Sequence, residues 1–139
     1  MTAALVLDAS VVLAWCFDDE ATSATREVLG RLDTDSAIAP SLLPLEIANV
    51  LALAERRKRI SPGRVAGFVE LIDTLAIEME EQTSARILHD VLNLARAEVL
   101  TAYDACYLEL AMRLGLPLAS KDVALRQAAT RLGVPLLGA

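Results

Sequence analysis

The 139-residue sequence predicts an α/β fold, a mainly parallel sheet of about four to five strands with helices on both faces. Short apolar runs alternate with longer amphipathic segments along the whole chain, which is typical of parallel strands joined by helical crossovers. Hydrophobic residues make up 55% of the chain and aromatic residues only 4%, so the core is expected to be aliphatic. A chain of this length is expected to form a single domain over residues 1–139.

Five short apolar runs are expected to be strands. In chain order they span residues 3–7, 36–39, 75–79, 117–120 and 134–137. Their apolar character favours buried parallel strands. Asp8 directly follows the first run, Pro40 ends the second, and Glu78 makes the third an imperfect strand.

The amphipathic segments between these runs are expected to be helices. They span residues 11–17, 22–32, 42–59, 62–73, 83–96, 101–115 and 122–132. Ser10, Ser41 and Ser61 precede three of them and are interpreted as N-caps, and Gly133 ends the last. The acidic turn at 18–20 is interpreted as helix-start chemistry, because carboxylates favour the positive end of a helix dipole.

The segment at 101–115 carries an acid on the helical face that should pack against the core. At about 100° per residue, Asp104 shares this face with Tyr107, Leu108, Ala111 and Leu114. Glu109 and Arg113, four residues apart on the opposite face, are interpreted as a solvated ion pair. Thr101 and Asp104 fit a capping box with aspartate in place of the usual glutamate, which would aim the Asp104 carboxylate.

Charge and cysteine content restrict the class of protein. The net charge of −6 argues against non-specific nucleic-acid binding by the bulk surface, but it is compatible with a nuclease whose acids gather at a metal site. Cys16 and Cys106 show no metal spacing or disulfide framework, and no secretory or membrane-spanning pattern is present, so a reduced cytoplasmic protein is expected. The basic run at 56–59 either complements its helix dipole or, like Lys121, contacts phosphates. His89 is interpreted as a surface residue.

Four acids are expected to converge although they lie far apart in the sequence. Asp8 and Asp122 each follow a strand, whereas Glu46 and Asp104 lie in early turns of helices next to strands. In a parallel sheet, ligands bind beyond the carboxyl ends of the strands. Clustered carboxylates repel by roughly 4 kcal/mol per pair at about 4 Å with an effective dielectric near 20, unless their pKa values rise or a hard cation binds. An all-oxygen ligand set indicates Mg²⁺ or Mn²⁺.

Other readings of these residues stay open at this point. Each aspartate has an ordinary explanation as a helix cap, and Glu46 could be satisfied by a backbone amide or an arginine. A glycine-rich phosphate loop and a Gly-x-Ser-x-Gly elbow are absent, and one histidine cannot build a zinc site unaided. A small-molecule phosphatase is disfavoured because Asp8 is not followed by the usual Asp-x-Asp pattern. Carboxylate-based metal hydrolysis is the chemistry best supported.

Three stretches resemble the PIN-domain ribonucleases, specifically the VapC-type toxins of bacterial toxin–antitoxin pairs. They read LVLDASVVLAWCFDDE, PSLLPLEIANVLALAERRKRIS and LTAYDACYLELAMRLGLPLASKDVAL. They follow the family's order and cover about half of the chain. The resemblance implies a PIN-like, Rossmann-like fold.

The resemblance also implies a catalytic and metal-binding site. It falls on Asp8, Glu46, Asp104 and Asp122, with Asn49 and Ser120 as supporting polar residues. It implies Mg²⁺-dependent endonucleolytic cleavage of RNA with Mn²⁺ as a substitute, by a metal-activated water that leaves 5′-phosphate and 3′-hydroxyl ends. A cognate antitoxin and a homodimer are implied partners. The alternatives are a PIN-fold module that acts through antitoxin binding without catalysis, and a housekeeping RNA-processing nuclease.

Overall fold

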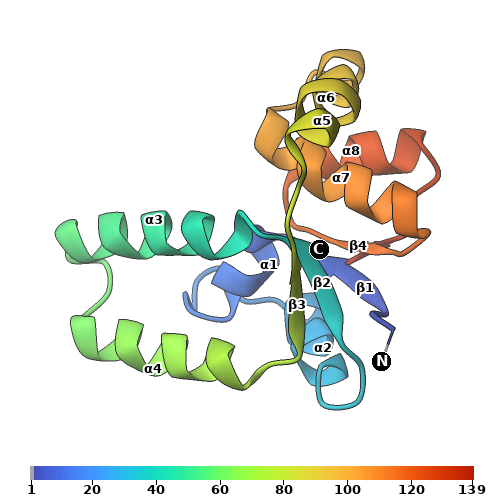
Figure 1. The fold of residues 1–139 in the computed structure, drawn as a ribbon. Coiled ribbons are helices and arrows are strands. Elements are labelled where there is room, and N and C mark those ends of the chain that lie inside the picture. The colour runs from blue at the N-terminus through green and yellow to red at the C-terminus, as the bar shows by residue number, and fades with distance from the viewer. Residues whose placement is uncertain (1) are drawn as a thin grey trace.

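The computed structural model describes residues 2–139, which form a five-stranded parallel sheet with helices around it (Figure 1). The strands are β1 (Leu5–Leu7), β2 (Ala37–Pro40), β3 (Ile77–Glu80), β4 (Leu118–Ala119) and β5 (Leu136–Leu137). Their order across the sheet is β3-β2-β1-β4-β5, and every neighbouring pair is parallel. The predicted α/β class is therefore confirmed.

Eight α-helices and one π-helical turn connect the strands in residues 2–139. The α-helices are α1 (Ala9–Ala14), α2 (Ser23–Arg31), α3 (Leu43–Arg56), α4 (Pro62–Thr74), α5 (Ser84–Arg86), α6 (Leu92–Glu98), α7 (Ala102–Leu114) and α8 (Val123–Arg131). The π-helical turn η1 (Ile87–Val91) joins α5 to α6, so the helix predicted at 83–96 contains one wide turn. None of these helices is both long and apolar enough to cross a membrane.

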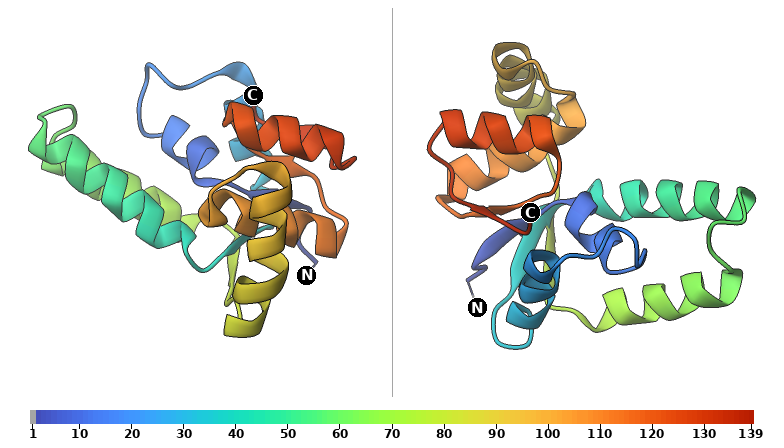
Figure 2. Two further views of the ribbon diagram at one scale, coloured as in Figure 1. Left: turned by 90° about the horizontal axis from the view of Figure 1, so that it is seen from above. Right: turned by 180° about the vertical axis from the view of Figure 1, so that it is seen from behind.

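The sheet is the centre of the core. All three residues of β1 are fully buried, as are Tyr107, Leu108 and Leu110 of α7. Helix α7 packs on β1, β2 and β4, while α1 and the hairpin formed by α3 and α4 lie on the other side of the sheet (Figures 1 and 2). The hairpin projects away from the sheet, so α3 forms an open angle with α5, α6 and α7, which lie above it in Figure 1.

Two of the three predicted serine N-caps are wrong, and α3 is shorter than expected. Helix α1 begins at Ala9 with Asp8 at its N-cap, so Ser10 lies inside the helix and not before it. Helix α3 begins after Leu42 and not after Ser41. It ends at Arg56 instead of residue 59, because the chain turns at Lys58, whose φ is +56°.

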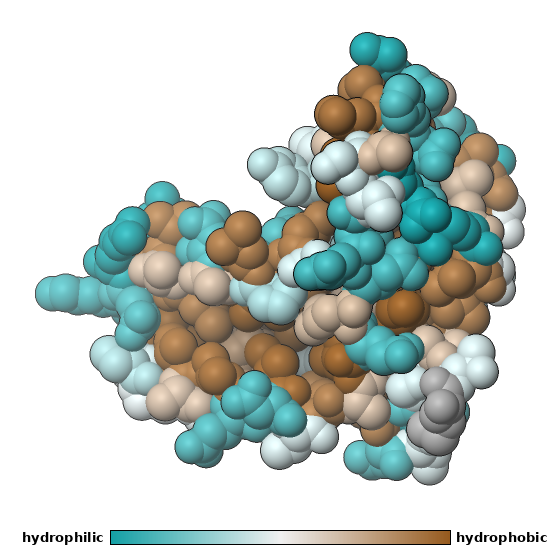
Figure 3. Space-filling view, in the orientation of Figure 1, coloured by the Kyte–Doolittle hydropathy of each residue, from teal (hydrophilic) through white to brown (hydrophobic). Residues whose placement is uncertain are grey.

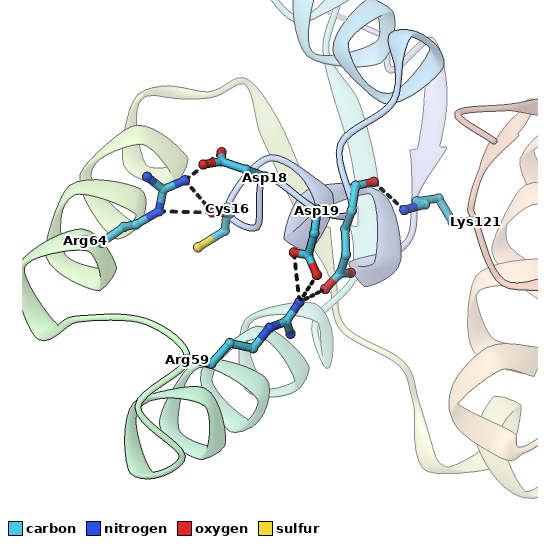
Figure 4. A network of polar contacts seen from close by, with 7 residues as sticks. Cys16, Asp18, Asp19, Arg59, Arg64 and Lys121 are labelled. Carbon is cyan, nitrogen blue, oxygen red and sulfur yellow. Dashed lines mark hydrogen bonds and ion pairs between the residues drawn. The ribbon is translucent and has the colours of Figure 1, made fainter.

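The acidic turn at 18–20 does not start a helix, contrary to prediction. Thr22 and Thr25 form the capping box of α2 by themselves. The turn is instead tied to the α3–α4 hairpin (Figure 4): Arg59 pairs with Asp19 at 3.2 Å and with Glu20 at 2.6 Å. Arg64 pairs with Asp18 at 3.0 Å and donates to the carbonyl of Cys16. These partners come from residues about 40 positions away, which local sequence rules do not detect.

The predicted pair between Glu109 and Arg113 forms, with 2.8 Å between Nε and Oε1, but its glutamate is buried. Glu109 is only 8% exposed, because α7 is covered on this side as well. Arg113 also pairs with Glu80 at the end of β3, and Arg86 lies 3.6 Å from Glu109. The pair thus joins α7 to β3 and α5.

Candidate active site

The four predicted acids all lie at helix N-termini beside the carboxyl ends of the strands. Asp8 and Asp122 are the N-cap residues of α1 and α8, and Glu46 and Asp104 lie in the first turns of α3 and α7. Their charges are close enough to interact, since each of Asp8, Glu46 and Asp104 has a pKa raised partly by other members of the set. The structure therefore brings the predicted acids to one edge of the sheet.

Asp8 is the most deeply buried member of the set, at 4% exposure. Its backbone N–H donates to the Ala119 carbonyl at 3.0 Å, because β1 and β4 pair with Leu7 opposite Ala119. This register places Ser120 beside Asp8. The hydroxyls of Ser10 and Ser120 each donate to Oδ2 of Asp8 at 2.7 Å. Burial nevertheless raises the pKa of Asp8, and the two hydroxyls oppose that shift.

Glu46 is held by Tyr107, a fully buried tyrosine of α7. The phenol donates to Oε1 of Glu46 at 2.5 Å. Burial raises the pKa of Glu46, the phenol opposes this, and the charges of Asp8 and Asp104 add to it. Neither a backbone amide nor an arginine satisfies Glu46 in the described residues, so its partner is one that neither sequence alternative included.

Asp104 sits at the third helical position of α7. The hydroxyl of Thr101 accepts from the Asp104 N–H at 3.1 Å, which is half of the predicted capping box. The reciprocal bond from the Thr101 N–H to the carboxylate is not formed within residues 2–139. Desolvation raises the pKa of Asp104 to about 6, with further contributions from the charges of Asp122 and Asp8.

Asp122 and Ser120 join the site to the start of α8. Asp122 caps this helix, because its Oδ2 accepts from the Leu125 N–H at 2.9 Å. The Asp122 N–H donates to the Ser120 hydroxyl at 3.0 Å. Ser120 therefore receives a bond from Asp122 while donating to Asp8, and it fixes the relative position of the two aspartates.

No cation within residues 2–139 forms an ion pair with any of the four acids. The positive ends of four helix dipoles offset part of the repulsion, each by an amount on the order of 1 kcal/mol or less. The donor set consists of carboxylate oxygens, which suit a hard divalent cation. No group of three or more of the described His, Cys, Asp and Glu side chains is close enough to hold an ion as it stands, so the ligand set is not preassembled.

The remaining predicted residues differ in their relation to the site. Asn49 lies on α3 one turn after Glu46 and is exposed. The Nζ of Lys121 donates to the Glu20 carbonyl (Figure 4), so this lysine is already engaged within the fold. The basic run at 56–59 lies at the far end of α3, about 15 Å along the helix axis from Glu46. His89 is exposed, as predicted.

Sequence reasoning missed two residues of the site, Ser10 and Tyr107. Ser10 also accepts from the Lys121 N–H at 2.9 Å, so it links the start of α1 to the segment after β4. The sequence contains the spacing Asp-x-Ser, but serine is so common at helix starts that this spacing alone indicates a cap. The helical spacing predicts that Tyr107 shares a face with Asp104, but no local pattern points to its partner 61 residues away.

Comparisons with known proteins agree with this architecture. The PIN domain family model matches residues 5–130. None of the curated proteins compared with the chain matches it.

Solved structures with the same fold cover nearly all of the chain. PAE2754 from Pyrobaculum aerophilum is similar over 96% of this chain and 83% of its own, with a TM-score of 0.72 and 21% identity. FitAcB from Neisseria gonorrhoeae is similar over 95% of both chains, with a TM-score of 0.61 and 15% identity. VapBC2 from Rickettsia felis, solved bound to a DNA fragment from their promoter, is similar over 95% of this chain and 96% of its own, with a TM-score of 0.64 and 8% identity. At these identities the likeness shows a shared fold.

Proposed function

Because the chain belongs to the PIN domain family, we propose that it is a Mg²⁺- or Mn²⁺-dependent endoribonuclease that acts as the toxin of a toxin–antitoxin pair. The observation that carries the proposal is the set of four carboxylates at the carboxyl edge of the sheet, without a cationic partner in residues 2–139. Structural roles do not require Asp8, Glu46 and Asp104 to have pKa values that are raised in part by neighbouring carboxylates.

We assign a role to each acid. Asp8, Glu46 and Asp104 would hold the metal directly or through water, and Asp122 would complete the site. When bound, a divalent cation supplies polarisation of the scissile phosphodiester and lowers the pKa of an attacking water. Attack by water and not by the ribose 2′-hydroxyl leaves a 5′-phosphate and a 3′-hydroxyl.

The surrounding residues orient these acids. Ser10 and Ser120 hold the Asp8 carboxylate through Oδ2, which leaves Oδ1 for a ligand. Tyr107 holds Glu46 through Oε1 in the same way. Since all three donors are neutral hydroxyls, none of them offsets the negative charge of the acid that it holds.

The proposed partner proteins follow from the resemblance to VapC-type toxins. We propose a cognate antitoxin that neutralises the enzyme, and a homodimer, acting in the cytoplasm where the RNA substrate is found. The fold shared with FitAcB and VapBC2 is consistent with this assignment. A short reading frame directly upstream that encodes a DNA-binding antitoxin would favour the toxin over a housekeeping nuclease.

The test is an RNA cleavage assay with the purified protein. We expect cleavage with Mg²⁺ or Mn²⁺, none with a chelator, and products that carry 5′-phosphates. Asp104→Asn should abolish cleavage, since it removes a ligand charge. The matched control is Asp33→Asn, an exposed aspartate outside the site, which should cleave like the wild type. Equal cleavage by the wild type and Asp104→Asn would overturn the catalytic proposal in favour of a non-catalytic module.

A further inference from the structure

A groove lies beside the acids, between the start of α3 and the start of α7. It is lined by Leu42, Leu45, Glu46, Asn49 and Tyr103, and its volume is about 520 Å³. Figure 3 shows the surface hollowed at this angle, between the arm that contains α3 and the mass that contains α7. The volume lies within the range of about 300–1,000 Å³ that is typical of ligand pockets. Because Glu46 belongs to the candidate active site, the groove is continuous with that site.

Tyr103 presents an open aromatic ring to this groove. Its side chain is 65% exposed, and it directly precedes Asp104. Its hydroxyl makes no hydrogen bond within residues 2–139, unlike the phenol of Tyr107, which is used inside the fold. Leu45, on the α3 side, is 74% exposed. An exposed aromatic and an exposed leucine on opposite walls suit a flat apolar ring between them.

The charge of the groove selects among the parts of a nucleotide. Among the described residues that line it, Glu46 is the one acid, and none is a lysine or an arginine. The lining therefore supplies no positively charged side chain for a phosphate, whereas a neutral base needs none. The Asn49 amide supplies one donor group and one acceptor, the combination that reads the edge of a base.

We propose that this groove holds the base of a nucleotide next to the scissile phosphodiester, stacked on Tyr103 with the Asn49 amide at its edge. This inference rests on the proposed RNA cleavage. A base in a duplex is already stacked and paired, so the substrate is single-stranded at this nucleotide. Tyr103 therefore acts in substrate binding and Asp104, the next residue, in catalysis.

The first experiment separates binding from chemistry. We measure kcat and KM with Mg²⁺ on a short single-stranded RNA that is cut once. Tyr103→Ala should raise KM by about tenfold or more with little change in kcat, because stacking on an aromatic side chain contributes this much per base. Tyr103→Phe keeps the ring and should restore the wild-type KM. Leu88→Ala, an exposed residue outside the groove, is the matched control.

The second experiment identifies the base. The nucleotides that flank the cut are replaced one at a time by abasic residues. At one position the abasic residue should raise the KM of the wild type as much as Tyr103→Ala raises it on the intact RNA. The same abasic residue should not raise the KM of Tyr103→Ala further, because both changes remove the same contact. Asn49→Ala should weaken any preference among bases at that position alone.

Two results would overturn the inference, and they differ from failure of the proposed function. If the effects of the abasic residue and of Tyr103→Ala on KM are independent at every flanking position, no base contacts Tyr103. An unchanged KM in Tyr103→Ala would show that the groove serves another occupant, such as a side chain of a protein partner. In both cases the wild type still cleaves RNA, whereas a wild type that cleaves no RNA rejects the proposed function itself.

Discussion

Tyr107 is the single residue on which the orientation of Glu46 depends. It is fully buried in α7, and its hydroxyl donates to Oε1 of Glu46. Burial and the neighbouring carboxylate raise the pKa of Tyr107, so its hydroxyl keeps its proton and remains a donor. A buried donor of this kind fixes one carboxylate oxygen of Glu46, and within residues 2–139 the other oxygen makes no hydrogen bond.

Tyr107→Phe is expected to release Glu46 while keeping the packing of the ring. Because a partly buried carboxylate would lose its donor, the free energy of unfolding should fall by about 1–3 kcal/mol. The Mg²⁺ concentration required for half-maximal RNA cleavage should rise, since Glu46 would no longer be held in place. A lower stability together with an unchanged Mg²⁺ requirement would contradict the positioning role and leave Tyr107 as a packing residue only.

For single residues, the sequence predicts the acids of the site better than it predicts the hydrogen-bond partners of those acids. Asp8, Asp104 and Asp122 were predicted because each lies next to a strand or at a helix start, where local rules apply. Tyr107 and Ser10 were missed as partners, because a hydrogen bond to a distant residue depends on the packing of α7 against α3 and on the pairing of β1 with β4. Such contacts have no local signature.

Two threonine N-caps allow a test of whether the start of a helix orients a residue of the site. Thr101 caps α7 and Thr83 caps α5, and each hydroxyl accepts from a backbone N–H at 3.1 Å. Replacing either by alanine should lower the free energy of unfolding by about 1 kcal/mol. Only Thr101→Ala should also lower the rate of RNA cleavage, because α7 carries Asp104 in its first turn.

The comparison of the two variants separates stability from function. Thermal unfolding followed by circular dichroism gives the loss of stability, and the cleavage assay gives the rate. If Thr83→Ala lowers the rate as much as Thr101→Ala does, the effect comes from general destabilisation and the cap has no part in orienting Asp104.

Elements with local signals were predicted well, and those fixed by distant partners were not. Helix α4 begins at Pro62 with Ser61 as its cap, as expected, because proline at the first position and serine before it act locally. The prediction for the acidic turn at 18–20 is wrong because its partners, Arg59 and Arg64, come from the α3–α4 hairpin. The charge pattern alone does not distinguish a helix dipole from a distant arginine.

The order of the strands explains why acids from distant parts of the chain meet. With β1 between β2 and β4, the ends of these three parallel strands lie next to one another, and the helices that follow or precede them begin there. The sequence predicted parallel strands and acids at their ends. It did not predict the order, because several orders of five parallel strands satisfy the same hydrophobic pattern.

Concentrating acids in this way has a cost for the stability of the whole molecule, and this cost depends on pH. The pKa of Asp104 is about 6 in the folded protein, against the ordinary value of 3.8 that is taken for the unfolded chain, so the folded state binds the proton more tightly. Stability is therefore reduced above pH 6 and recovers as the pH falls from about 6 to 4. Asp104→Asn removes the charge and should stabilise the protein at pH 7.5 by an amount on the order of 1 kcal/mol, after allowance for the partial exposure of Asp104.

Unfolding measured between pH 4 and 8 tests this expectation, with Asp33→Asn as the control that should follow the wild type. The difference between Asp104→Asn and the wild type should be largest above pH 6 and should become small near pH 4, where the carboxyl is protonated in the folded state and partly protonated in the unfolded state. Mg²⁺ should stabilise the wild type at pH 7.5 more than Asp104→Asn, because a cation that binds only the folded state offsets the same repulsion. A difference that stays constant with pH would mean that the substitution acts through packing and that the charge of Asp104 does not strain the fold.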